Sequence, residues 1–142
     1  MIRSRVTIAA WVVVILFSST SLAGRLSDHA FISVATVFPD PLQHNHSAVS
    51  DLYVIAEKSF HLLLFSTLGF LLWKVISDLS RKFTLILFVG LVIGSLSEAV
   101  QLFFPDRDPT LRDVLIDVVG TAMGALLARA ISRRQLRHAS NV

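Results

Sequence analysis

The sequence predicts an all-α, polytopic membrane protein, a small bundle of about four transmembrane helices. Of its 142 residues, 54% are hydrophobic and only 16% are charged, and the mean hydropathy is +0.68. Soluble domains usually carry about 25% charged residues. The apolar residues also occur in long blocks, and a chain in lipid must satisfy its own backbone hydrogen bonds. Because the short alternating segments of an outer-membrane barrel are not seen, helices are expected throughout.

The first apolar block lies within residues 1–23 and is expected to form a first transmembrane helix or signal anchor. Arg3 and Arg5 precede this block, and small residues end it. A charged start, an apolar run and small residues also resemble a cleavable signal peptide. Both alternatives remain open, and each places the segment that follows outside the cell membrane.

Residues 53–131 are expected to form a three-helix membrane core. An extracytoplasmic loop over residues 24–52 comes before it, because Pro39 and Pro41 do not fit a helix interior. A basic cytoplasmic tail over residues 132–142 comes after it. Within the core, apolar helices are predicted over residues 53–76, 83–104 and 110–131, separated by a polar turn and by a Pro-Asp-Arg-Asp-Pro break.

Basic residues are distributed unequally between the two sides of this bundle. One side holds the N-terminus, the turn after residue 76 and the tail, and its only acid is Asp78. Lys and Arg accumulate on the cytoplasmic side of membrane proteins, so both termini are predicted to be cytoplasmic in a bacterial inner membrane. This pattern also explains a pI near 10.0 without nucleic acid as a partner. The basic residues on that side are Arg3, Arg5, Lys74, Arg81, Lys82, Arg129, Arg133, Arg134 and Arg137.

Ionisable residues inside the predicted helices form a layer near their outer ends. Each such group costs a few kcal/mol in lipid, so these side chains are expected to face one another. Asp113, Asp117, Gly120 and Gly124 fall within an arc of roughly 60° on the last helix. The two glycines let a neighbouring helix approach closely, which would bring the aspartates against Glu98. The full layer comprises Glu57, Lys58 and His61, then Glu98 and Gln101, then Asp113 and Asp117.

Two different functions are compatible with such a layer. In the first, cations pair with a phosphate or carboxylate headgroup, and Glu98 or Asp113 acts as acid or base beside it. The candidate cations are Lys58, His61, Arg107 and Arg112, and Gln101 and Asp117 complete the ligand-binding set. In the second, the layer only fixes the packing of the helices.

The same residues resemble a known family. The run from Glu98 through Gln101 to Arg107, continued by the aspartates and glycines of the last helix, is similar to the VanZ-like pattern. That pattern consists of Glu-x-x-Gln, a Pro-x-Arg turn, an Asp and a Gly-x-x-x-Gly helix. The segment from Glu57 to His61 resembles the family's Asp-Lys-x-x-His, with Glu in place of Asp, and Asp117 stands where Asn is usual. The resemblance implies a cell-envelope membrane protein linked to tolerance of the glycopeptide teicoplanin.

The expected partners are membrane lipid and an envelope lipid or glycopeptide-related ligand. The sequence leaves the reaction, any cofactor and the oligomeric state open. A metal site from His61, Glu98, Asp113 and Asp117 is compatible by ligand type, but convergence of the three helices is required, so none is predicted. The chain has no cysteine, which excludes a disulfide or a thiolate ligand.

Overall fold

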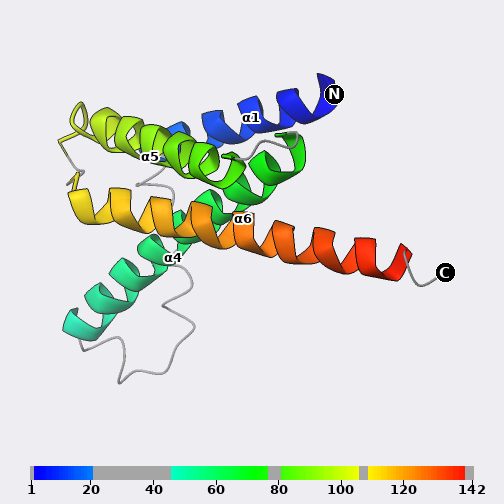
Figure 1. Cartoon of the computed structure of the whole chain (residues 1–142). Coiled ribbons are helices and arrows are strands. Elements are labelled where there is room, and N and C mark those ends of the chain that lie inside the picture. The colour runs from blue at the N-terminus through cyan, green and yellow to red at the C-terminus, as the bar shows by residue number, and fades with distance from the viewer. Residues whose placement is uncertain (1, 21–45, 77–80, 106–108, 140–142) are drawn as a thin grey trace.

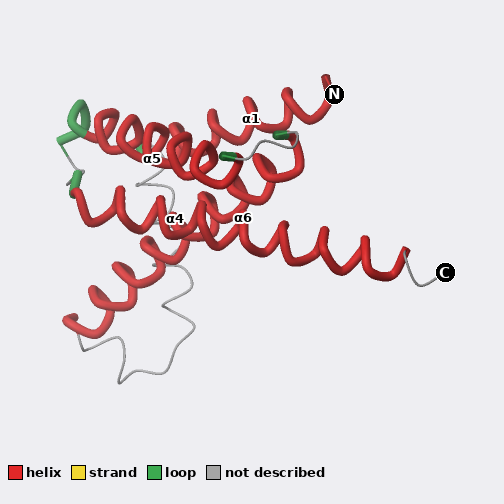
Figure 2. The backbone as a smooth tube through the Cα atoms, viewed as in Figure 1, coloured by secondary structure: helices red, strands yellow, loops and turns green. Residues whose placement is uncertain are grey.

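The computed structural model describes residues 2–20, 46–76, 81–105 and 109–139. This part of the chain folds into helices only, as the sequence predicts, and contains no strand (Figure 2). The helices are α1 (Ile2–Ser18), α4 (His46–Val75), α5 (Lys82–Gln101) and α6 (Leu111–Ala139).

Three of these helices are long and apolar enough to cross a membrane. The spans are Val54–Val75, Lys82–Gln101 and Leu111–Gln135. The apolar part of α1, Arg5–Ser18, is shorter. At 1.5 Å per residue it covers roughly 20 Å, compared with a hydrocarbon core of about 30 Å. α1 nevertheless packs against α4 and α5, so the described residues form a bundle of four helices, of which three have the length of a full span.

Two helices extend beyond their predicted ends. α4 begins at His46, within the segment predicted as a loop up to residue 52, because no proline lies between Pro41 and Pro105 to interrupt it. α6 continues to Ala139, through most of the predicted tail. The residues from Ser132 to Ala139 include no Gly or Pro, and arginine and glutamine are good helix formers.

Close contacts give the direction of each helix in the bundle. α4 and α6 run parallel, since Lys58 lies beside Asp113 and, further along both helices, Gly69 lies beside Thr121. α5 runs antiparallel to α6, because Gly94 lies against Asp117 and the earlier Gly90 against Thr121. α1 runs in the same direction as α5 and antiparallel to α6. Its Trp11 ring donates to the Leu64 carbonyl at 2.9 Å, and its last turn lies beside the end of α5. The start of α1, the end of α4, the start of α5 and the end of α6 therefore lie at one end of the bundle (Figure 1).

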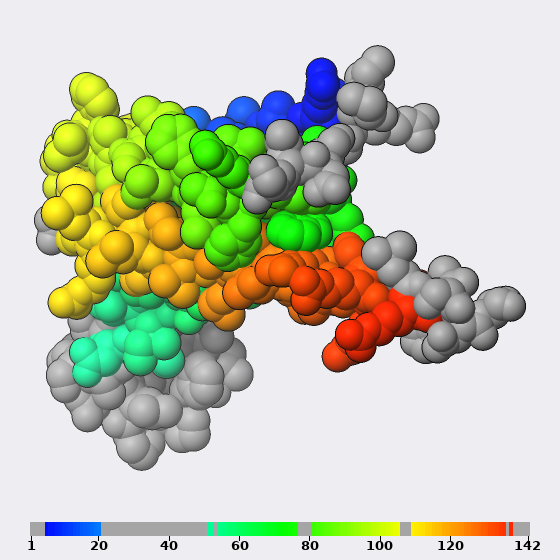
Figure 3. All heavy atoms as spheres, in the orientation of Figure 1, coloured from blue at the N-terminus to red at the C-terminus, as the bar shows by residue number. Residues whose placement is uncertain are grey.

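Apolar side chains form a core cluster inside the bundle and also cover much of its surface. Buried side chains from all four helices form one core cluster: Ile15, Leu64, Phe65, Leu68, Leu72, Ile86, Ile93 and Ala125. Large apolar side chains such as Phe60, Leu63 and Phe88 are more than half exposed. The end of α6 projects beyond the body of the bundle (Figure 3). Soluble monomers rarely expose so many large apolar side chains. A surface that faces lipid does expose them, because acyl chains are themselves apolar.

Candidate functional site

An ion pair joins α4 to α6 near the start of α6. The end of α6, with its arginines, lies at the opposite end of the bundle, which we call the basic end. The Lys58 ammonium lies 2.5 Å from Asp113 Oδ1 and 2.6 Å from Oδ2, so it contacts both carboxylate oxygens. The Asp113 side chain is only 7% exposed, whereas the Lys58 side chain is 32% exposed. A largely buried carboxylate thus pairs with a lysine whose side chain is partly exposed.

A second pair lies deeper between the same two helices. His61 Nδ1 lies 3.3 Å from Asp117 Oδ1, and both side chains are buried. His61 follows Lys58 by three residues and Asp117 follows Asp113 by four, so parallel helices stack the two pairs. The other oxygen of Asp117 has no hydrogen-bond partner in the described part of the chain. It faces Gly94, where a methyl group would lie 3.1 Å from it.

Glu98 connects α5 to the start of α6. The backbone N–H of Thr110 donates to Glu98 Oε2 at 2.8 Å, and the Gln101 amide donates to Oε1 at 3.2 Å. The Thr110 hydroxyl in turn accepts from the backbone N–H of Asp113 at 3.3 Å, which makes it the N-cap of α6. A carboxylate at the N-terminus of a helix is favoured by the helix dipole.

A known protein family also covers these residues. The model of the VanZ/LLP1 family matches residues 5–132, which is most of the chain and includes every side chain of the cluster. The chain belongs to the VanZ/LLP1 family. No curated protein and no solved structure matches it. With three candidate spans, it is a VanZ-like membrane protein.

The structure describes eight of the nine predicted site residues of this VanZ/LLP1 protein. Arg107 lies outside the described residues. Among the others, Lys58 is partly exposed and the remaining side chains and glycines are buried. We refer to the polar members as the polar cluster: Lys58, His61, Glu98, Gln101, Asp113 and Asp117.

The partners of the two aspartates differ from those expected. The sequence predicts that close packing along the α6 glycines would bring both aspartates against Glu98. Gly120 and Gly124 instead lie against α4, where a methyl group on Gly120 would be 2.7 Å from the Leu62 carbonyl and one on Gly124 would overlap that of Ser66. The aspartates therefore meet Lys58 and His61 of α4, while Glu98 approaches α6 at Thr110, whose hydroxyl accepts from the backbone N–H of Asp113.

Sequence reasoning missed three features of the site. Thr110 was not singled out, although its place after Pro109 and three residues before Asp113 is typical of an N-cap. Gly90 and Gly94 allow α6 to approach α5, and their spacing of four signals a small-residue face. The hydroxyls of Ser19 and Ser97 form a buried 2.5 Å hydrogen bond that fixes the end of α1 near Glu98.

The chemistry available to the polar cluster is ionic and hydrogen-bonding. Within the described ranges, no three His, Asp or Glu side chains are placed to hold one metal ion. The cluster offers one partly exposed cation, three buried carboxyl groups and an imidazole. This set suits an anionic headgroup that approaches Lys58, with acid or base groups behind it.

Replacing Thr110 by valine is expected to lower the free energy of unfolding by about 1 kcal/mol, the usual effect of losing an N-cap. Valine keeps the shape of the side chain, and the backbone N–H that binds Glu98 remains. Reversible unfolding in mixed micelles measures the change. Thr84→Val, at an exposed position near the start of α5, is the matched control and should leave stability unaltered. Equal stability of the two variants would show that Thr110 does not cap α6.

Proposed function

We propose that this VanZ/LLP1 protein binds the polar headgroup of an amphiphilic cell-envelope compound through the polar cluster. The observation that carries the proposal is the Lys58–Asp113 pair: a buried carboxylate positions a lysine whose side chain remains 32% exposed. An ion pair serving packing alone gains nothing from that exposure. An anionic lipid or a glycopeptide-related ligand presents the phosphate or carboxylate that such a cation accepts.

Each predicted residue has a role in this proposal. Lys58 contacts the anionic headgroup, and Arg107 supplies a second cation. Gln101, His61 and Asp117 hold the geometry of the cluster through the contacts described above. Should the compound also be transformed, Glu98 and Asp113 are the carboxyl groups placed to move a proton.

The proposal includes a location. The basic end of the bundle carries Arg5, Lys74, Arg81, Lys82 and the arginines in the last turns of α6, which supports a cytoplasmic placement of both termini. The polar cluster then lies in the outer leaflet of the bacterial inner membrane. Envelope intermediates and glycopeptides act on that side, and the family resemblance supports a contribution to teicoplanin tolerance.

A non-enzymatic scaffold is the second candidate, and one observation favours it. Most polar groups of the cluster already have partners within the chain: Glu98 has two donors, and Asp113 has Lys58. A scaffold needs no further ligand. The two functions differ in whether a charge can be removed from the cluster without effect when the fold is preserved.

Glu98→Gln tests this difference. The glutamine carbonyl still accepts from the Thr110 N–H, so folded yield in the membrane is expected to stay within about twofold, while teicoplanin tolerance of cells expressing the protein falls to that of cells without it. Ser95→Ala, at an exposed position on the same helix, is the control for both measurements. Normal yield with full tolerance would overturn the proposal, and lost yield would favour the scaffold.

A further inference from the structure

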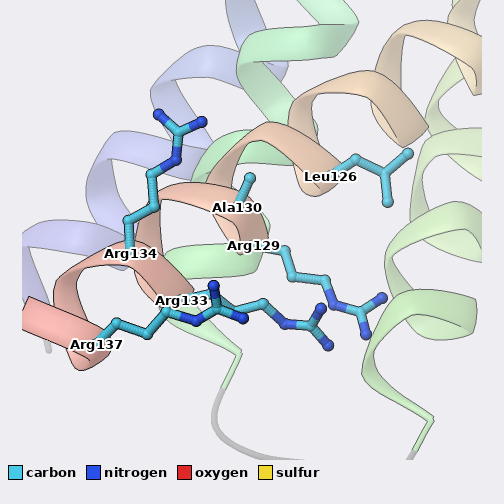
Figure 4. Close-up of a pocket in the computed structure, with 6 residues that line it drawn as sticks. All are labelled: Leu126, Arg129, Ala130, Arg133, Arg134 and Arg137. Carbon is cyan, nitrogen blue, oxygen red and sulfur yellow. The ribbon is translucent and has the colours of Figure 1, made fainter. Parts of the chain in front are cut away.

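A stripe of arginines runs along the last turns of α6, at the end of the bundle opposite the polar cluster. Arg129, Arg133 and Arg137 are spaced by four residues, which places them on one face of the helix. Figure 4 shows their guanidinium groups extending to the same side, while that of Arg134 points away. With Leu126, Ala130 and Arg134 these residues line a hollow of about 370 Å³.

The depth of this stripe matches the boundary between acyl chains and headgroups. The apolar span of α6 ends at Gln135, so Arg129 and Arg133 lie within its last two turns. Leu126 is one turn deeper and 49% exposed. A ligand with charge at the level of the arginines and an alkyl chain at the level of Leu126 fits this arrangement.

The first two arginines of the stripe lack a counter-charge from the described part of the chain. Neither Arg129 nor Arg133 forms an ion pair with a carboxylate there, whereas both described acids that pair with α4 lie at the other end of α6. Closely spaced guanidinium groups repel one another unless an anion lies among them. Arginine binds phosphate with two parallel hydrogen bonds, so a phosphodiester is the anion that fits best.

We propose that Arg129 and Arg133 bind the phosphate headgroup of an anionic phospholipid, with an acyl chain packed on Leu126. The site lies in the leaflet opposite the polar cluster and does not depend on the function proposed for that cluster. It also differs from a mere orientation signal, because it requires particular arginines and not only positive charge at this end of the chain.

The test uses the purified full-length protein in nanodiscs made of equal parts phosphatidylcholine and phosphatidylglycerol. Native mass spectrometry then counts the lipids that stay bound. Phosphatidylglycerol is expected to be retained in preference to phosphatidylcholine, and Arg133→Gln or Arg129→Gln to reduce its retention about fivefold each. Arg81→Gln removes the same charge from an exposed position at the same end of the bundle and is the matched control, with retention expected to be unchanged.

Several outcomes would overturn the proposal. Equal losses for Arg133→Gln and Arg81→Gln would reveal diffuse attraction without a site. Equal retention of the two lipids would remove the headgroup as the determinant, and displacement of the lipid by inorganic phosphate alone would point to a free anion as the ligand. Arg133→Lys keeps the charge but not the paired hydrogen bonds, and it should give a loss smaller than that of Arg133→Gln.

Discussion

Lys58→Met is expected to lower the free energy of unfolding by about 2 to 3 kcal/mol. The substitution leaves Asp113, whose side chain is 7% exposed, without its cation. Removing one partner of a buried pair costs about 3–5 kcal/mol, and partial exposure of Lys58 reduces that effect. Equilibrium unfolding in mixed micelles measures the difference. Lys74→Met is the control, because Lys74 is exposed and contacts the Phe70 ring, and no described acid pairs with it.

The double variant Lys58→Met with Asp113→Leu separates stability from function. Replacing a whole ion pair by apolar groups is often neutral, so most of the lost stability should return. The binding proposal expects such a folded protein to remain without teicoplanin tolerance. A double variant with restored stability and full tolerance would leave the scaffold as the function of the pair.

Gly124→Ala is expected to cost a similar 2 to 3 kcal/mol, a large effect for a single methyl group. The added carbon would overlap the backbone carbonyl of Ser66, and a helix backbone cannot move aside as a flexible side chain does. α4 and α6 must then separate where they cross, which also loosens the contact between His61 and Asp117. Folded yield and unfolding in micelles both report this change.

Val119→Leu serves as the control for Gly124→Ala. It also enlarges a side chain of α6, but Val119 is 53% exposed and faces outward. Its stability should match that of the unaltered chain. An alanine at position 124 that is equally well tolerated would contradict the close crossing of α4 and α6.

The sequence was sufficient to predict the fold class and the position of the polar cluster along the helices. Long apolar blocks require helices in lipid, and acids such as Glu98 and Asp117 within those blocks cannot face acyl chains. Helical periodicity also places Asp113, Asp117 and the two glycines on one face, and all four positions are buried.

The partners of those acids could not be predicted in the same way. Periodicity gives the face of a helix but does not identify the neighbouring helix that covers it. The glycine face meets α4, so Asp117 is paired with His61 and not with Glu98. The bond from Thr110 to Glu98 involves a backbone N–H, which every residue except proline carries, so residue identity gives no signal for it.

The central claim is that the side chains of the polar cluster face one another inside the bundle. Detecting the contact between the Lys58 ammonium and the Asp113 carboxylate tests it most directly. The chain has only three lysines, Lys58, Lys74 and Lys82, so selective labelling is practical. Solid-state NMR on proteoliposomes with ¹⁵N-labelled lysine ammonium and ¹³C-labelled aspartate carboxyl groups measures their dipolar coupling. We predict a coupling that corresponds to direct contact and disappears in Lys58→Met. A coupling that is absent, or that persists in that variant, would contradict this arrangement of α4 and α6.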